Sequence, residues 1–146
     1  MTETAPERVL LNKIRSDVDY GRVFLQERAK RSLAFFCREV LGFDKLWDGL
    51  HRELCDFVQH DPRPEKLIQL PRGHLKTTIC TIGLPLWCVL RDPNERDLII
   101  TATATNAQKW IGMMEHILLT NPLLRLIFPG VIPEDPSKVR WNQDGF

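Results

Sequence analysis

Apolar residues recur at helical spacing through the first part of the chain. Their period of three or four residues predicts a helix that begins near Phe24 and can be capped by Gly42. Its buried stripe comprises Leu25, Ala29, Leu33, Phe36 and Val40. A second helix is predicted from Leu46 to Gln59, and it should end where Pro62 and Pro64 forbid continuation. The polar residues 1 to about 20 have little periodicity and are predicted to be a mobile lead-in.

The pattern changes after these prolines. A short apolar run over residues 66–70 predicts a buried strand, and a second strand is predicted over residues 97–102. Between them, residues 76–90 predict an apolar helix that Pro85 should kink near Thr81. A capping box at 105–108 predicts a final helix that stops before Asn121. The order of strand, loop, helix, strand and helix is typical of an α/β fold with a parallel sheet.

Composition restricts the classes of function. The chain has 146 residues, 43% hydrophobic and 27% charged, which is ordinary for a globular protein in water. A net charge of +1 gives no overall attraction to nucleic acid, so a DNA contact would need a local patch. The basic side of the first helix, around Arg28 and Arg38, is either such a patch or simply solvated. The start lacks the features of a signal peptide, and no apolar run is long enough for a membrane span, so we expect a cytoplasmic protein.

Sulfur chemistry is not indicated. The four cysteines form no CxxC pair, and no histidine lies at zinc-finger spacing from them. We therefore expect reduced, mostly buried thiols that behave as small apolar side chains. They are Cys37, Cys55, Cys80 and Cys88.

The segment that suggests chemistry lies between the first predicted strand and the helix after it. Its residues are Arg72, Gly73, His74, Leu75, Lys76, Thr77 and Thr78. Triphosphate binding needs inward backbone N–H groups, a cation for the β and γ phosphates and a hydroxyl for Mg²⁺. A lysine followed by a threonine at a helix start supplies the last two.

This segment departs from the general pattern GxxxxGK[ST]. That pattern would place glycines at positions 70 and 75, and both residues are leucine here. Only Gly73 offers unrestricted backbone torsions. From the residues alone, an ordinary basic turn between a strand and a helix remains an alternative to a nucleotide site.

A wider series of features resembles the large subunit of phage terminases, the ATP-driven motors that package DNA. An arginine four residues before the lysine, as Arg72 stands before Lys76, is typical of phosphate loops in that family. The resemblance covers about two thirds of the chain. The other features in this series are a helix with His51 near its start, Pro-Leu-Trp at 85–87, TATATNAQ at 101–108, Asn121-Pro122, Phe128-Pro129 and Trp141-Asn142.

The resemblance implies roles for individual residues. Lys76 would hold the β and γ phosphates of ATP, and Thr77 would bind Mg²⁺. Arg72 would sense or stabilise the γ phosphate, and His51 would lie near the base, although a surface histidine is an alternative reading. Four residues would line the cradle, namely Gly73, His74, Leu75 and Thr78. Residues 1–64 would form a helical lead-in, and residues 65–146 the first half of a P-loop ATPase domain.

The resemblance also implies partners. The intact family acts on double-stranded DNA with a small terminase subunit and a portal, works as an oligomer, and cleaves the genome. This chain lacks the acids that follow a second apolar strand in that family and lacks the nuclease domain. We therefore expect a truncated motor that is inactive alone. The alternatives are a non-catalytic prophage remnant or interaction fragment, and the start of a P-loop helicase-like protein.

Overall fold

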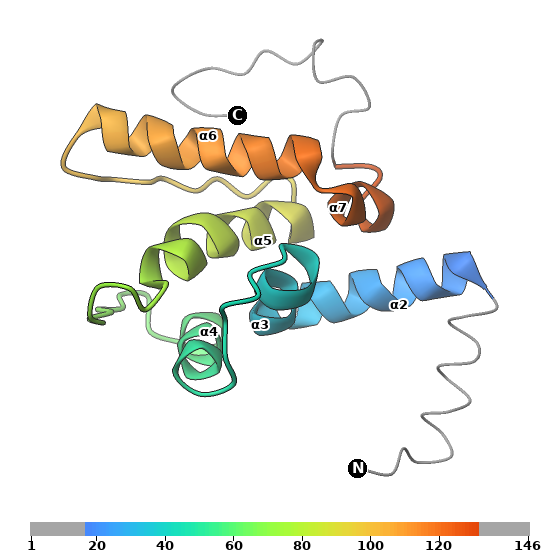
Figure 1. Ribbon diagram of the computed structural model, residues 1–146, viewed down its shortest axis with the longest axis horizontal. Coiled ribbons are helices and arrows are strands. Elements are labelled where there is room, and N and C mark those ends of the chain that lie inside the picture. Colours follow the sequence, from blue (N-terminus) through green and yellow to red (C-terminus); the bar gives the residue numbers. More distant parts are fainter. Residues whose placement is uncertain (1–16, 132–146) are drawn as a thin grey trace.

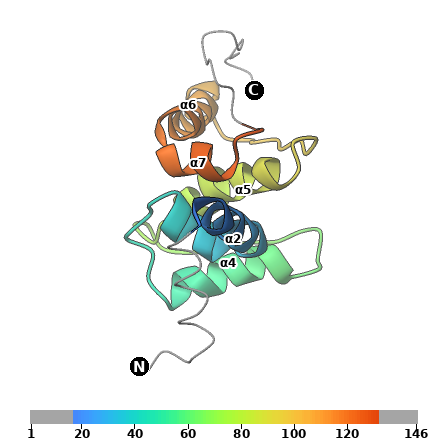
Figure 2. The same cartoon turned by 90° about the vertical axis from the view of Figure 1, so that its right-hand side faces the viewer.

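The computed structural model describes residues 17–131, which form helices joined by loops (Figure 1). The elements in chain order are α2 (Val18–Arg31), α3 (Leu33–Phe35), the π-helix η1 (Phe36–Val40), α4 (Leu50–His60), the π-helix η2 (Thr78–Gly83), α5 (Leu84–Arg91), α6 (Ala104–Thr120) and α7 (Pro122–Ile127). In both views the run from η2 to α5 lies between α6 on one side and the helices α2 and α4 on the other (Figures 1 and 2). No helix within residues 17–131 combines the length and apolar character needed to cross a bilayer.

The predicted first helix is interrupted at Ser32. Ser32 has extended backbone torsions and both ends α2 and caps α3, where its hydroxyl accepts from the N–H of Phe35 at 3.2 Å. The Gln59 side chain of α4 covers this break: it accepts from the N–H of Leu33 at 2.8 Å and donates to the carbonyl of Arg31 at 2.7 Å. Backbone groups freed by the interruption are therefore satisfied by the neighbouring helix.

The helix that follows the loop is wound as a π-helix in its first part. Pro85 has no N–H, and the N–H of Leu84 bonds to the carbonyl of Ile79, five residues back. The hydrogen-bond register is therefore shifted by one residue around Thr81, where the sequence predicted a kink. Gly83 lies in this stretch, and a Cβ at this position would come within 2.5 Å of the Cys37 Sγ atom. The glycine therefore permits close packing of η2 against η1.

The hydrophobic core joins elements from both sides of the expected boundary at residue 64. Ala29, Leu33 and Phe36 are buried in one cluster with Ile79, Leu86 and other residues up to Phe128. Two polar links cross this core. The Trp87 indole donates to the carbonyl of Ala29 at 2.8 Å, and the Asn121 amide donates to the carbonyl of Val40 at 2.7 Å.

The predicted α/β sheet is wrong for the part of the chain that the structure describes. Residues 17–131 contain no β-strand, and residues 66–70 and 97–102 are extended loops. Exposure does alternate along residues 66–70, as in a strand. The backbones of these two segments, however, pair with no other segment in the described residues. Alternating apolar and polar residues place the side chains on two faces, but a strand also needs a neighbouring strand to hydrogen-bond its backbone. Leu67, Leu98 and Ile100 consequently remain more than 80% exposed.

Helix boundaries also differ from those predicted. The second helix begins at Leu50 and not at Leu46, although it ends close to the predicted position. The capping residue of α6 is Thr103, whose hydroxyl accepts from the N–H of Asn106, and not Thr105. Residues 132–146 lie outside the described part, and with them the Trp141-Asn142 feature.

Candidate phosphate-binding loop

Residues 71–75 form a loop at one end of the helix that runs through η2 and α5 (Figure 1). The extended residues 66–70 precede the loop, and helical backbone begins at Lys76. The predicted order of extended segment, loop and helix is therefore present, although without the sheet. This order places Lys76 and Thr77 in the first helical turn, directly after the loop.

The backbone of the loop twice adopts left-handed torsions. Gly73 has a φ of 86° and Leu75 has a φ of 50°. Leu75 is the only residue other than glycine with a positive φ among residues 17–131. A bulky side chain is uncommon there, because its Cβ approaches the following carbonyl and costs about 1–2 kcal/mol. Position 75 is also where the general phosphate-loop pattern requires glycine.

Four successive backbone donors at this turn have no acceptor among the described residues, as is usual at a helix start. The N–H groups of residues 75–78 donate no hydrogen bond within residues 17–131, and the first helical bond is donated by Ile79 to the carbonyl of Leu75. A left-handed residue beside a right-handed one can turn successive N–H groups to the same side, which is the backbone conformation of an anion-binding nest. The helix N-terminus adds its positive dipole to this site.

The predicted side chains surround the nest. Arg72 is exposed, and Lys76 and Thr77 are half-buried. No carboxylate within residues 17–131 forms an ion pair with Arg72 or Lys76, and the Thr77 hydroxyl makes no hydrogen bond there. Burial raises the pKa of the Cys80 thiol to about 11, and the ammonium of Lys76 opposes this shift, so the lysine lies near the next helical turn.

Two histidines hold the carbonyl groups of the loop. Nδ1 of His74 lies 3.3 Å from the carbonyl oxygen of Arg72, and Nε2 of His51 lies 3.2 Å from the carbonyl oxygen of His74. His51 is only 4% exposed, so the alternative reading of a surface histidine is wrong. Its other ring nitrogen, Nδ1, accepts from the N–H of Trp47 at 3.2 Å.

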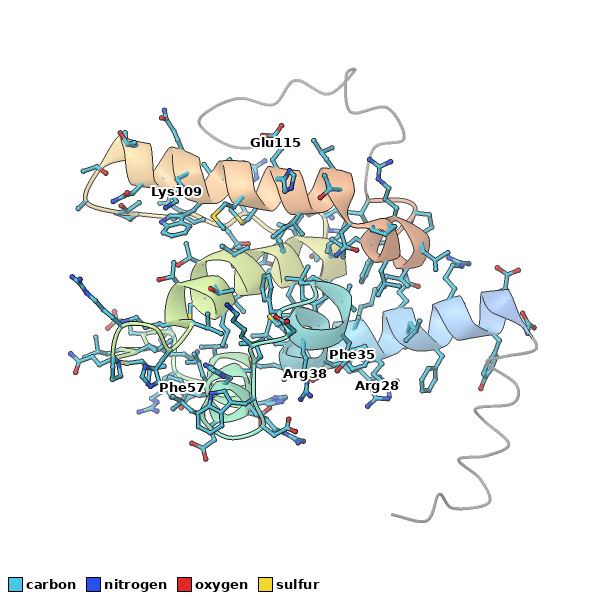
Figure 3. All side chains as sticks on the ribbon, in the orientation of Figure 1. Arg28, Phe35, Arg38, Phe57, Lys109 and Glu115 are labelled. Atoms are coloured by element: carbon cyan, nitrogen blue, oxygen red, sulfur yellow. The ribbon has the colours of Figure 1, made fainter. Side chains whose placement is uncertain are left out.

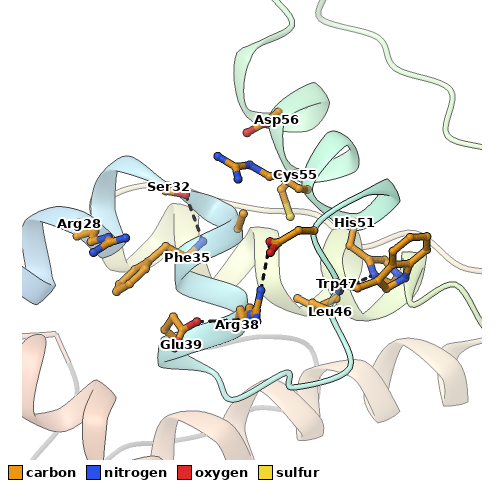
Figure 4. Close-up of a pocket in the computed structure, with 13 residues that line it drawn as sticks. Arg28, Ser32, Phe35, Arg38, Glu39, Leu46, Trp47, His51, Cys55 and Asp56 are labelled. Carbon is orange, nitrogen blue, oxygen red and sulfur yellow. Dashed lines mark hydrogen bonds and ion pairs between the residues drawn. The ribbon is translucent and has the colours of Figure 1, made fainter. Parts of the chain in front are cut away.

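A cavity of about 340 Å³ lies beside His51 (Figure 4), and none of residues 71–78 lines it. Its charged residues balance: Arg38 pairs with Glu39 at 3.5 Å and with Asp48 at 3.2 Å. The guanidinium of Arg28 stacks 4.6 Å from the ring centre of Phe35. The side chains of Arg28, Phe35 and Arg38 project from the same side of α2, α3 and η1 (Figure 3). Arg28 and Arg38 are therefore already engaged, and the cavity's third arginine, Arg52, is accompanied by Asp56 in the lining.

The first carboxylates after the loop in sequence lie beyond the helix that follows it. The helical run over residues 76–91 is about 24 Å long, and it places Asp92, Glu95 and Asp97 at its far end (Figure 1). Burial and the neighbouring Glu95 raise the pKa of Asp97. No cluster of three metal-ligating side chains occurs in the described residues. A Mg²⁺ ion at the loop would be held by the Thr77 hydroxyl and by the phosphates, whereas protein sites for Mg²⁺ commonly add one or two carboxylates.

Sequence reasoning missed how His51 and Trp47 contribute. We expected His51 to be near a nucleotide base, but its contact in the structure is with the loop backbone. The spacing of four residues between Trp47 and His51 was the available signal, because it allows a side chain to bond a backbone N–H ahead of a helix. The left-handed Leu75 had no signal beyond its position in the general pattern.

Comparison of the chain with protein-family models, with curated proteins and with solved structures gives no match. Functional inference consequently depends on the geometry of the loop and on the resemblance described above.

Proposed function

We propose that residues 72–78 bind the phosphate groups of ATP together with Mg²⁺. The observation that carries this proposal is the left-handed backbone of Leu75, immediately before Lys76. Position 75 is one of the two positions where the general phosphate-loop pattern has glycine, and a left-handed backbone at this position supports the proposal. Such strain persists only where the surroundings enforce it, and it concentrates at functional sites.

Each predicted residue has a role in this proposal. The N–H groups of Leu75, Lys76 and Thr77 face the phosphate oxygens, and the Lys76 ammonium neutralises the β and γ phosphates. The Thr77 hydroxyl ligates Mg²⁺, which also binds the phosphates. The exposed Arg72 approaches the γ phosphate as a permanently charged fork. Gly73, His74 and Thr78 complete the cradle.

We further propose that the chain is the ATP-binding part of a DNA-packaging motor of the terminase type. The support is the order of motifs, with an arginine four residues before the lysine and TATATNAQ downstream. The corresponding partners are double-stranded DNA, a small terminase subunit and a portal, within the cytoplasm of a host cell. The α/β sheet expected for such a motor is not part of this proposal.

A calorimetric titration with ATP and Mg²⁺ tests the phosphate loop. Lys76→Ala should weaken binding about tenfold to a hundredfold, because a charge-assisted contact contributes about 1.5–3 kcal/mol. Lys109→Ala is the matched control: it removes the same charge from α6, where the ammonium lies 5.2 Å from the Trp110 ring centre. Equal affinities for the parent and Lys76→Ala would exclude the loop as the site.

A further inference from the structure

His51 connects the first turn of α4 to the backbone of the phosphate loop. It is 4% exposed, and it is the one buried histidine among the described residues. Its imidazole spans two segments that are distant in sequence: Nδ1 meets the N–H of Trp47, and Nε2 meets the carbonyl of His74. A buried polar group of this kind fixes geometry, because leaving either partner unsatisfied is costly.

The two contacts define the protonation of the ring. A backbone N–H can only donate, so Nδ1 of His51 must carry a lone pair and accept from Trp47. A carbonyl can only accept, so Nε2 must carry the proton and donate to His74. Both requirements are met by the neutral imidazole with its proton on Nε2. In that form the ring has no remaining donor or acceptor for a ligand.

We propose that His51 is a positioning residue for the phosphate loop and that it directs the N–H of Leu75 toward a bound phosphate. The peptide between His74 and Leu75 is trans, so its carbonyl and its N–H point in opposite directions. By holding the carbonyl toward α4, His51 turns the N–H to the opposite side, where it donates to no protein group within residues 17–131. This inference rests on the proposed phosphate site.

The same bond stabilises the strained conformation of Leu75. Rotation of the peptide between His74 and Leu75 away from the left-handed geometry would break the contact with Nε2 and leave the buried imidazole with an unused donor. The Leu75 side chain also packs against the hydrophobic core. The Trp47 ring packs against His51 and meets the imidazole edge-on, with ring centres 5.6 Å apart. The loop backbone is thus held by the Nε2 donor of a buried histidine.

Two substitutions of His51 separate the hydrogen bond from the volume of the ring. His51→Phe keeps an aromatic ring but removes both nitrogens, whereas His51→Gln keeps an amide donor near the position of Nε2. We expect His51→Phe to weaken binding of ATP with Mg²⁺ about tenfold, and His51→Gln to recover most of this loss. Equal affinities for His51→Phe and the parent, or equal losses in both variants, would overturn the proposal.

Nuclear magnetic resonance of the whole chain without nucleotide provides a second readout. The imidazole spectrum should show the His51 proton on Nε2, with a coupling across the hydrogen bond to the His74 carbonyl carbon. The amide resonance of Leu75 should move in His51→Phe more than in Trp47→Phe, which retains the backbone contact. Protonation on Nδ1 alone, or an unmoved Leu75 amide, would refute the positioning role.

These measurements distinguish failure of the inference from failure of the proposed function. If Lys76→Ala binds ATP like the parent, the phosphate site is wrong, and the resonance experiment alone then decides whether His51 orients the loop. If Lys76→Ala loses affinity while both His51 variants bind normally, the phosphate site stands and the positioning role fails.

Discussion

The left-handed backbone of Leu75 can be tested by comparing glycine and alanine at that position. Both substitutions remove the leucine side chain, which is half-buried against the core, at a cost of about 1 kcal/mol. Alanine keeps the Cβ and therefore keeps the strain of a φ of 50°. Glycine has no Cβ and adopts this torsion freely. We expect Leu75→Gly to be more stable than Leu75→Ala by about 1 kcal/mol.

This order is the reverse of that in an ordinary helix, which supplies a matched control. Gly112 lies exposed in α6, and a Cβ added there would meet no atom within 4 Å. Gly112→Ala should stabilise the protein by about 0.5–1 kcal/mol, because alanine is the better helix former. Glycine should therefore give the higher free energy of unfolding at position 75, and alanine should give the higher value at position 112.

Urea unfolding followed by circular dichroism measures both differences. With a slope near 2 kcal/mol per molar, 1 kcal/mol moves the midpoint by about 0.5 M, which is readily resolved. Leu75→Gly should still bind ATP with Mg²⁺, because it leaves the backbone N–H groups in place, but more weakly than the parent, because the glycine loop has more conformational entropy to lose on binding. An alanine variant as stable as the glycine variant at position 75 would show that the left-handed torsion is absent, and the argument for a phosphate cradle would lose its basis.

Two further outcomes follow from the packing and from the position of the carboxylates. Gly83→Ala should destabilise the chain by about 1–3 kcal/mol, because its Cβ would meet Cys37 Sγ at 2.5 Å. In urea unfolding, the double variant with Cys37→Ala should recover part of that loss. If the two losses of stability simply add, the clash is absent. In a phosphate-release assay the chain should show little or no ATP turnover. Hydrolysis needs an acid near the Mg²⁺ ion, and the acids between α5 and α6 follow the end of the helical run that is opposite to the loop. Turnover at rates typical of enzymes that is abolished by Lys76→Ala would contradict this.

The helices were predictable where a side-chain pattern alone decides the structure. Apolar spacing identified the buried positions Ala29, Leu33 and Phe36. The break at Ser32 was not predictable, because it depends on Gln59 reaching across from another helix to satisfy the exposed backbone groups. The strands failed for a similar reason. Alternation along residues 66–70 describes one segment, but a sheet is a relation between two backbones.

The sequence predicted which residues form the candidate site more completely than it predicted their backbone conformation. The residues from Arg72 to Thr78 were identified from their types and spacing, and the structure places them around a turn that leads into a helix. Leu75 was interpreted as a departure from the general pattern. Its φ of 50° lies in the left-handed region that glycine adopts freely, although the residue is a leucine. No local pattern could reveal this, because a sequence records which side chain is present and not which torsion the surroundings impose.

A leucine at this position requires a compensation that glycine would not. Glycine reaches the left-handed region without cost but also leaves it freely, so a loop built on glycine becomes ordered when its ligand binds. Leu75 resists that torsion and must be held there by its packing on the core and by the bond from His51 to the neighbouring carbonyl. A loop held in this way is already ordered before a phosphate arrives, and it has less conformational entropy to lose on binding. The strain at Leu75 and the buried histidine behind it are therefore two parts of one arrangement, and under the proposed function this arrangement fixes a costly backbone conformation before the phosphate binds.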